Sequence, residues 1–294
     1  MTVLITGATG FIGKHLTRRL AAEGHEVVAL TRPSSTIAAL PAHVPHIAFH
    51  GDVAELAAQL RAQRITGIVH LASMFTSTHA PGDVAALIDS NVRLPAQLLE
   101  AATAAAVSWF INTGTFWQHS DTQDYTPANL YAATKQAFET VARYYIDATD
   151  ITFVTVALSD TFGADDTRAK LFTLLMRSAL TGEELHMTAG EQQIDISYID
   201  NVIDGYRRLI DLLSTDDPAT LQGTTFAISS GNVMTLKELA CIFEREANVT
   251  LNMRWGTRGY RPREVMRTWT KGQPIPGWTP TVSVAEGIRR AWRG

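Results

Sequence analysis

The sequence predicts an α/β protein in which a doubly wound parallel sheet is followed by a smaller C-terminal α/β lobe. Three observations predict this class. A glycine-rich turn at residues 6–13 joins the apolar run 3–5 to a helical pattern. Short β-branched runs then alternate with amphipathic segments, which is typical of repeated βαβ units. After Ser159 this alternation changes, which indicates a second lobe.

The first turn has the glycine spacing of a dinucleotide-binding site. Gly7 permits the tight turn, Gly10 lets the backbone approach a pyrophosphate, and Gly13 lets the helix pack closely on the strand. The helix would direct its free N–H groups and positive dipole end at the phosphates. The alternative is a tight strand-to-helix turn that binds nothing. The other turn residues expected to contact a cofactor are Thr9, Phe11 and Ile12.

The second strand, residues 26–30, follows Gly24, which we expect to end the first helix. An NAD site would place an acidic residue just after this strand, to accept from the ribose 2′-hydroxyl. This chain carries Arg32 there instead. A guanidinium favours a 2′-phosphate, so we expect NADP, although a solvated surface arginine would fit the same position.

The third and fourth strands, residues 46–50 and 65–72, each end in candidate cofactor contacts. Asp52 would accept from an adenine amino group, or cap the helix 54–61, or both. His70 lies inside the fourth strand, and we expect a core histidine rather than a catalyst. The remaining cofactor-binding candidates at these strand ends are Val53, Leu71, Ala72 and Ser73.

The segment 83–106 is helical in pattern, but Pro95 interrupts it. Proline lacks the N–H group that would bond the carbonyl of Asn91, so we predict a kink there. The freed carbonyl could face a cleft and hold an ordered water; the alternative is a kink relieved by solvent.

The fifth strand, residues 108–113, places Thr113 and Thr115 at its carboxyl end, where open α/β sheets bind ligands. Asn129 then caps a helix on which Tyr131 and Lys135 are four residues apart and share one face. A nearby ammonium favours the phenolate, so such a pair is a tunable proton donor. Spacing alone leaves open a surface Tyr/Lys pair.

These motifs together resemble the extended short-chain dehydrogenase/reductase family, also called the NAD-dependent epimerase/dehydratase family. The resemblance implies that Tyr131 is the general acid/base, that Lys135 binds the nicotinamide ribose, and that Thr113 bonds the substrate oxygen. Trp117 replaces the tyrosine usual in the family, so Thr115 remains a possible substitute donor. The positions that carry the resemblance are Gly7, Gly10, Gly13, Asp52, Val53, His70, Leu71, Ala72, Asn91, Thr113, Tyr131 and Lys135.

The resemblance also implies a domain plan. Residues 1–160 would form an NADP-binding Rossmann domain, and residues 161–294 mainly a substrate-binding lobe, with about 194–213 returning to the first domain. Residues 226–228 are expected in the smaller lobe, and 284–292 as a core helix. The expected substrate-binding residues are Thr115, Trp117, Asp160, Arg168, Lys170 and Arg263. Arg168 and Lys170 could contact a nucleotide diphosphate, and the alternative is a solvated loop. Arg261, Arg263 and Glu264 lie in a polar segment that could close over the substrate.

The expected reaction is the NADPH-dependent reduction of a keto group, at C4, on a nucleotide-activated deoxysugar. Family dehydratases resemble one another in an Asp-Glu pair after the active-site threonine, and Gly114-Thr115 has no carboxylate. The segment around Tyr131 is most similar to the ketoreductases of the family. The alternatives are an NAD-dependent nucleotide-sugar epimerase and, from another class, a non-catalytic NADP-sensing regulator. We expect a nucleotide-diphosphate sugar as substrate and a homodimer.

Composition limits the other partners. The formal net charge is -4, and no basic stripe is present to bind nucleic acid or an anionic membrane. No apolar run reaches the roughly 18 residues of a membrane span, and the first strand begins at Thr2, which leaves no room for a signal peptide. The single cysteine, Cys241, lies among apolar residues at helical spacing, so we expect a buried thiol. We expect a cytoplasmic protein without a metal.

Overall fold

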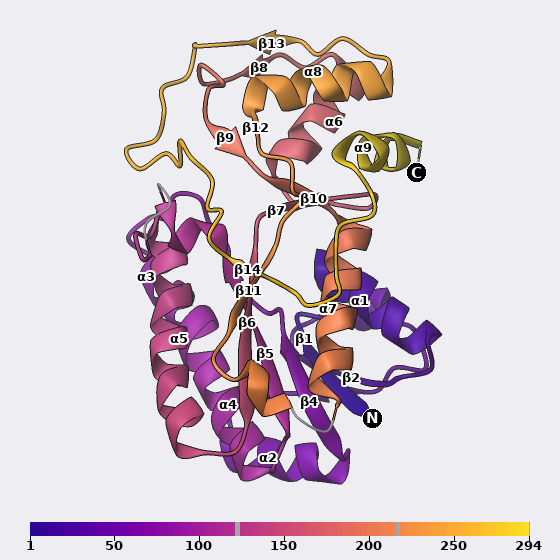
Figure 1. Cartoon of the computed structure of the whole chain (residues 1–294), viewed down its shortest axis with the longest axis vertical. Helices are drawn as coiled ribbons and strands as arrows, with labels where there is room; N and C mark the ends of the chain where they lie inside the picture. The colour runs from indigo at the N-terminus through magenta and orange to yellow at the C-terminus, as the bar shows by residue number, and fades with distance from the viewer. Residues whose placement is uncertain (121–123, 216–217, 294) are drawn as a thin grey trace.

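The computed structural model describes residues 1–120, 124–215 and 218–293. Its main sheet has eight strands in the order β14-β11-β6-β5-β4-β1-β2-β3, and the neighbouring strands run parallel (Figure 1). The strands are β1 (Thr2–Thr6), β2 (Glu26–Thr31), β3 (His46–Ala48), β4 (Ile65–His70), β5 (Trp109–Thr115), β6 (Thr152–Leu158), β11 (Thr225–Ile228) and β14 (Gln273–Pro274). The predicted α/β class and doubly wound parallel sheet are confirmed.

Helices cover both faces of this sheet because alternate strand residues point to opposite sides. Val3 and Ile5 belong to one apolar cluster, whereas Leu4 between them belongs to the other. The first cluster contains α1 (Phe11–Ala22) and α7 (Ile199–Leu213). The second contains α2 (Val53–Ala62), α4 (Leu94–Ala104) and α5 (Leu130–Ala148).

A smaller lobe stands above the carboxyl ends of the strands (Figure 1). Its helices are α6 (Leu171–Thr181), α8 (Leu236–Ala247) and α9 (Val284–Arg293). Three two-stranded sheets accompany these helices. They pair β7 (Asp160–Phe162) with β10 (Ile196–Tyr198), β9 (Gln193–Ile194) with β12 (Met234–Thr235), and β8 (Leu185–His186) with β13 (Met253–Arg254). The predicted final helix is confirmed as α9, whose Val284, Ile288 and Ala291 are buried.

The placement of residues 226–228 in the smaller lobe was wrong. β11 pairs with β6 in the main sheet, in the register Phe226 with Val156. The helix α7 carries the chain back along the main sheet, so the strand that follows it starts beside β6 rather than beside α8 (Figure 1). The local pattern of a short apolar strand does not show which sheet it joins.

The helical segment before β5 is interrupted as Pro95 predicts, and the interruption is a π-helical turn. The helix α3 (Asp83–Ile88) passes into the π-helix Asp89–Arg93 and then into α4. Within the turn, the N–H of Leu94 bonds the carbonyl of Asp89, five residues earlier. A single π-turn of this kind is frequent at functional sites.

Two further expectations concern single residues. Cys241 is exposed, so the buried thiol was wrong. The helix α8 buries Leu239, Ala240 and Phe243, and Cys241 falls on its outer face. His70 is fully buried, as predicted, and its Nδ1 lies 2.9 Å from Oγ1 of Thr6. Within the described ranges, no helix combines the length and apolar character needed to cross a bilayer.

Candidate active site

The glycine turn fits the phosphates of a dinucleotide. Gly7 has φ +65°, and a Cβ atom there would lie 2.8 Å from the backbone N of Ala72. A Cβ atom on Gly13 would lie 2.1 Å from the carbonyl oxygen of Gly7. Gly10 caps α1 without a side-chain hydrogen bond, so the N–H groups of the first helical turn remain available to an anion.

A cavity of about 1080 Å³ extends from this turn to the smaller lobe. This volume lies just above the roughly 300–1,000 Å³ of a pocket for one drug-sized ligand. The predicted cofactor-binding and catalytic residues that line it are Gly7, Gly10, Phe11, Ile12, Gly13, Leu71, Ser73, Thr113, Tyr131 and Lys135. The predicted substrate-binding residues that line it are Thr115, Trp117, Asp160, Arg168 and Lys170.

Lys135 is a buried cation that lines the cavity. It lies one turn after Tyr131 on α5, whose N terminus Asn129 caps by accepting from the N–H of Ala132. Lys135 is 1% exposed, and its ammonium has no hydrogen-bond partner among the described residues. Burial lowers the pKa of Lys135 to about 8, and the nearby carboxyl of Glu139 opposes this shift. An unpaired buried ammonium beside a cavity is suited to bind hydroxyl groups of a ligand.

Tyr131 presents its phenol to the same cavity. Burial raises the pKa of Tyr131 to about 12, and a hydrogen bond with Ser73 opposes that shift. Ser73 in turn donates to Oδ1 of Asn91 at 3.0 Å, so the phenol is linked to the π-helical turn. The neutral phenol is therefore the resting form of Tyr131, as a proton donor requires.

Asn91 acts in the structure through its side chain. It is fully buried, its Oδ1 accepts from Ser73 and the N–H of Met74, and its Nδ2 donates to the carbonyl of Met74 and to Thr134. These bonds tie the segment after β4 to α5. The sequence argument, which concerned only the carbonyl of Asn91, missed this link.

The two candidate hydroxyls differ in what they bond. Oγ1 of Thr115 accepts from the N–H of Trp117 at 3.3 Å, in a local cap of the next turn. Oγ1 of Thr113 lies 2.7 Å from the phenol oxygen of Tyr206, on α7. Among the described residues, Tyr206 is the one hydrogen-bond partner of the Thr113 hydroxyl, and Thr113 also lines the cavity.

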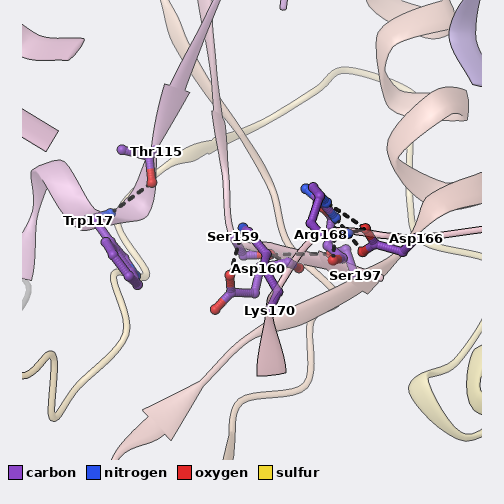
Figure 2. A network of polar contacts seen from close by, with 9 residues as sticks. Thr115, Trp117, Ser159, Asp160, Asp166, Arg168, Lys170 and Ser197 are labelled. Carbon is purple, nitrogen blue, oxygen red and sulfur yellow. Dashed lines mark hydrogen bonds and ion pairs between the residues drawn. The ribbon is translucent and has the colours of Figure 1, made fainter. Parts of the chain in front are cut away.

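One wall of the cavity carries aromatic and cationic side chains. Phe75 lies edge-on to Tyr131 at 5.1 Å between ring centroids and contacts Trp117 at 5.6 Å. The ammonium of Lys170 lies 4.7 Å from the centroid of Phe75, and the guanidinium of Arg261 lies 5.1 Å from that of Trp117. Figure 2 shows Trp117 across the site from Asp160, which forms an ion pair with Lys170 at 3.3 Å.

Arg168 lines the cavity close to the glycine turn. Its guanidinium is held by Asp166 at 2.7 Å and by Thr161, as Figure 2 shows for Asp166. It also lies 4.3 Å from the ring centroid of Phe11 in the glycine turn. Arg168 thus lies over the glycine turn, and the carboxylate of Asp166 partly compensates its charge.

Several predicted residues do not line the main cavity. Asp52 caps α2 by accepting from the N–H of Glu55, which confirms one of its two expected roles. Arg32 is exposed at the end of β2. Arg263 donates to the carbonyl of Pro127 and lines a neighbouring cavity of about 590 Å³, whereas Arg261 lines both cavities. The others outside the main cavity are Thr9, Val53, Ala72 and Asn91.

The sequence argument gave no role to Phe75 or Tyr206, and it treated Arg261 only as part of a polar segment that could close over the substrate. Phe75 lies in the loop after β4 and lines the cavity. Its position just after the carboxyl end of a strand could have indicated a ligand contact. The ion pair of Arg261 with Glu264 at 2.6 Å holds the guanidinium beside Trp117, a placement that the sequence did not indicate. Tyr206 had no local signal, because its contact with Thr113 spans 93 positions of the chain.

Comparison with known families now decides the family. The model of the NAD dependent epimerase/dehydratase family matches residues 3–221. The chain belongs to this family. Its glycine turn, Tyr131 and Lys135 all lie within the matched residues.

Among curated relatives, this member of the NAD dependent epimerase/dehydratase family is similar to two groups. It is 24% identical to a CDP-abequose synthase of Salmonella muenchen, over 98% of this chain and 96% of the relative. It is 26% identical to a CDP-abequose synthase of Salmonella typhimurium, over 97% and 95%. It is also 26% identical to a UDP-glucose 4-epimerase of Mycolicibacterium smegmatis, over 99% and 97%.

Solved structures share the fold of this family member. A UDP-glucose 4-epimerase of Thermus thermophilus in complex with NAD has a TM-score of 0.85 at 22% identity, covering 100% of this chain and 99% of that chain. A dTDP-glucose 4,6-dehydratase of Streptomyces venezuelae with NAD bound has a TM-score of 0.85 at 22% identity, covering 100% and 96%. These likenesses support the Rossmann-type fold described above.

Replacing Lys135 by Met should stabilise the protein while abolishing its activity. At pH 7 the folded state holds a buried charge whose pKa lies near 8 instead of the ordinary 10.5. The difference corresponds to about 3 kcal/mol, which a methionine of similar shape would not cost. Because the folded state releases this proton first, wild-type stability rises between about pH 8 and 10.5, and the advantage of the variant should shrink there.

Calorimetric melting of Lys135→Met at pH 7 and pH 10 checks this. The exposed Lys271, changed to Met, is the matched control and should leave the melting temperature unchanged. A Lys135→Met protein that melts below wild type at pH 7 would contradict the argument.

Proposed function

We propose that the protein reduces a keto group, at C4, on a nucleotide-activated deoxysugar, with NADPH as the reductant. The observation that carries this proposal is the buried, unpaired Lys135 beside Tyr131 in a cavity that continues into the smaller lobe. The similarity to CDP-abequose synthases over almost the whole chain supports the choice of sugar class.

The residues would divide the chemistry between them. A bound reduced nicotinamide supplies the hydride that the carbonyl carbon accepts. Tyr131 donates its phenolic proton to the carbonyl oxygen, so the product is an alcohol and Tyr131 is left as phenolate. Thr113 donates a hydrogen bond to the same oxygen as its negative charge develops. The Lys135 ammonium stabilises the phenolate until solvent returns the proton.

The cofactor would lie along the glycine turn. Gly7, Gly10 and Gly13 would admit the pyrophosphate to the N terminus of α1, and Lys135 would bond the ribose next to the nicotinamide. Arg32 supports NADP over NAD, because it is exposed at the end of β2 and none of the described residues bonds its guanidinium. Its backbone N–H bonds Oγ of Ser35, which shapes the loop around it.

The nucleotide sugar would occupy the part of the cavity that the smaller lobe covers. Lys170 and Arg261 bring positive charge to this region, where a diphosphate would need it. Phe75 and Trp117 offer apolar ring surface to a deoxysugar, which has fewer hydroxyl groups to solvate. Arg168 would sit between the two ligands.

Elimination chemistry is disfavoured by packing. A Cβ atom on Gly114 would lie 2.9 Å from Oε1 of Gln118 and 3.2 Å from Oε1 of Glu139. A carboxylate at this position would therefore meet an existing buried carboxyl group, whose pKa burial already raises. An NAD-dependent epimerase remains the alternative enzyme. A non-catalytic NADP sensor would have no use for the phenolic proton of Tyr131.

A cytoplasmic location accompanies the proposal. The chain has one cysteine, which is free, so it needs no oxidising compartment to form disulfides.

Changing Tyr131 to Phe should preserve cofactor binding and remove about two decades or more of turnover, because the general acid is lost. Turnover is followed by nicotinamide absorbance with NADPH and NADH, against a panel of CDP-, dTDP- and GDP-4-keto-6-deoxysugars. The matched control is Tyr145→Phe on the same helix, whose hydroxyl bonds Glu100 away from the cavity. Unchanged turnover in Tyr131→Phe would reject the assignment of the acid.

Changing Arg32 to Ala should raise the KM for NADPH roughly 10- to 100-fold, the usual cost of one charge-assisted contact, and leave the KM for NADH unchanged. Steady-state kinetics with each cofactor at saturating sugar measure both values. Arg18→Ala, an exposed arginine on α1, should change neither. Equal losses with both cofactors would show that Arg32 does not read a 2′-phosphate.

The face formed by α3 and α5 supports a homodimer. Val84 and Ile88 of α3 and Val141 and Tyr144 of α5 are exposed apolar residues on helices in mutual contact. Light scattering at micromolar concentration should show a dimer, and Val141→Glu should convert it to a monomer. Val233→Glu, at a valine of nearly equal exposure in the smaller lobe, should remain dimeric. A monomeric wild type would rule out this assembly.

A further inference from the structure

Tyr206 is a buried tyrosine whose phenol contacts Thr113, a residue that lines the cavity. It projects from α7, is fully buried, and belongs to the apolar cluster between α7 and the sheet. Its oxygen lies 2.7 Å from Oγ1 of Thr113, and this is the phenol's one hydrogen bond to the residues that the structure describes. Tyr206 does not line the cavity, whereas Thr113 does.

The direction of this hydrogen bond decides what Thr113 can do. Each hydroxyl has one proton to donate and lone pairs with which to accept. If Thr113 donated to Tyr206, the phenolic proton would be left without an acceptor in an apolar core, at a cost of about 1–3 kcal/mol. If Tyr206 donates, its proton is satisfied, and the proton of Thr113 is free to face the cavity.

Two features keep Tyr206 in the donating state. Burial raises the pKa of Tyr206, the hydrogen bond with Thr113 opposes that shift, and the nearby Tyr131 adds to it; the net rise keeps the phenol protonated wherever the enzyme works. Thr113 is the one hydrogen-bond partner of the Tyr206 hydroxyl among the described residues, so no second acceptor there competes for its proton.

We propose that Tyr206 is a positioning residue that donates to Thr113 and thereby directs the Thr113 proton at the substrate's carbonyl oxygen. The donated bond also polarises the Thr113 hydroxyl, which makes it a better donor in the chain Tyr206, Thr113, substrate oxygen. Tyr131 and Thr113 then approach that oxygen as two donors of different kinds. Tyr131 transfers its proton, while Thr113 retains its own. This inference rests on the proposed function only in requiring hydride transfer at a carbon whose oxygen Thr113 holds.

The test is a double-mutant cycle between Tyr206→Phe and Thr113→Ala. Tyr206→Phe should lower kcat about tenfold, a fraction of the 10²–10³-fold effect of removing a whole oxyanion donor, with little change in KM or in NADPH affinity. In the Thr113→Ala background the same change should cost nothing further, because the proton that it directs is gone. Independent losses that multiply would show that Tyr206 acts by another route and would overturn the proposal.

A matched control separates this role from general packing. Tyr198, on β10, is also buried, and none of the described residues bonds its hydroxyl, so Tyr198→Phe should leave kcat unchanged. If kcat also fell tenfold in Tyr198→Phe, the fall of kcat in Tyr206→Phe would be explained by packing, and the proposal would be overturned. Tyr206→Met, which fills a similar space without a donor, replaces Tyr206→Phe if that variant does not fold. Failure of both to fold would make Tyr206 a structural residue and overturn the proposal.

The assay distinguishes this failure from failure of the proposed function. Turnover is measured with the sugar on which wild type transfers hydride, in either direction. If wild type oxidises a hydroxy sugar with NAD but reduces no ketosugar, the proposed function fails, and the Tyr206 cycle still gives its answer. If wild type reduces a ketosugar and Tyr206→Phe matches it, only the role of Tyr206 fails. Absence of any hydride transfer overturns both.

Discussion

The buried ammonium of Lys135 is the constraint on which the site depends. A cation that is 1% exposed and lacks a bonded partner among the described residues lowers the stability of the apo fold, and its pKa falls to about 8. The fold tolerates it because a large apolar core surrounds α5 and the sheet. The same charge is what a neutral phenol needs beside it when it gives up a proton. In the proposed mechanism, stability and chemistry therefore make opposite demands at Lys135.

The site is assembled from both faces of the sheet. Tyr131 and Lys135 come from α5 on one face, and Tyr206 supports Thr113 from α7 on the other. The edge between them is the carboxyl end of β5, so hydride transfer would occur where the two layers meet (Figure 1). The π-turn adds a third support, because Asn91 ties the segment after β4 to α5 through Met74 and Thr134. The groups that we propose to react are thus held by helices and a strand rather than by loops alone.

Local spacing predicted the parts of the site that local physics determines. The Gly7 turn, the Asn129 cap and the one-turn separation of Tyr131 and Lys135 each follow from a few adjacent residues. Contacts between distant segments could not be read in this way. The Thr113–Tyr206 bond, the placement of Arg261 over Trp117 and the pairing of β11 with β6 all depend on how α7 and the smaller lobe return to the sheet. The prediction that Cys241 is buried was wrong because its apolar neighbours in the sequence do not determine which side of α8 it occupies.

The most direct test of the central claim is to follow the hydride itself. Wild-type protein is incubated with NADPH carrying deuterium at the transferable position and with a nucleotide-4-keto-6-deoxysugar, and both products are analysed by mass spectrometry. The account predicts one deuterium in the sugar product for each NADP formed. Deuterium retained in the cofactor, with a sugar that is epimerised or dehydrated instead of reduced, would contradict it.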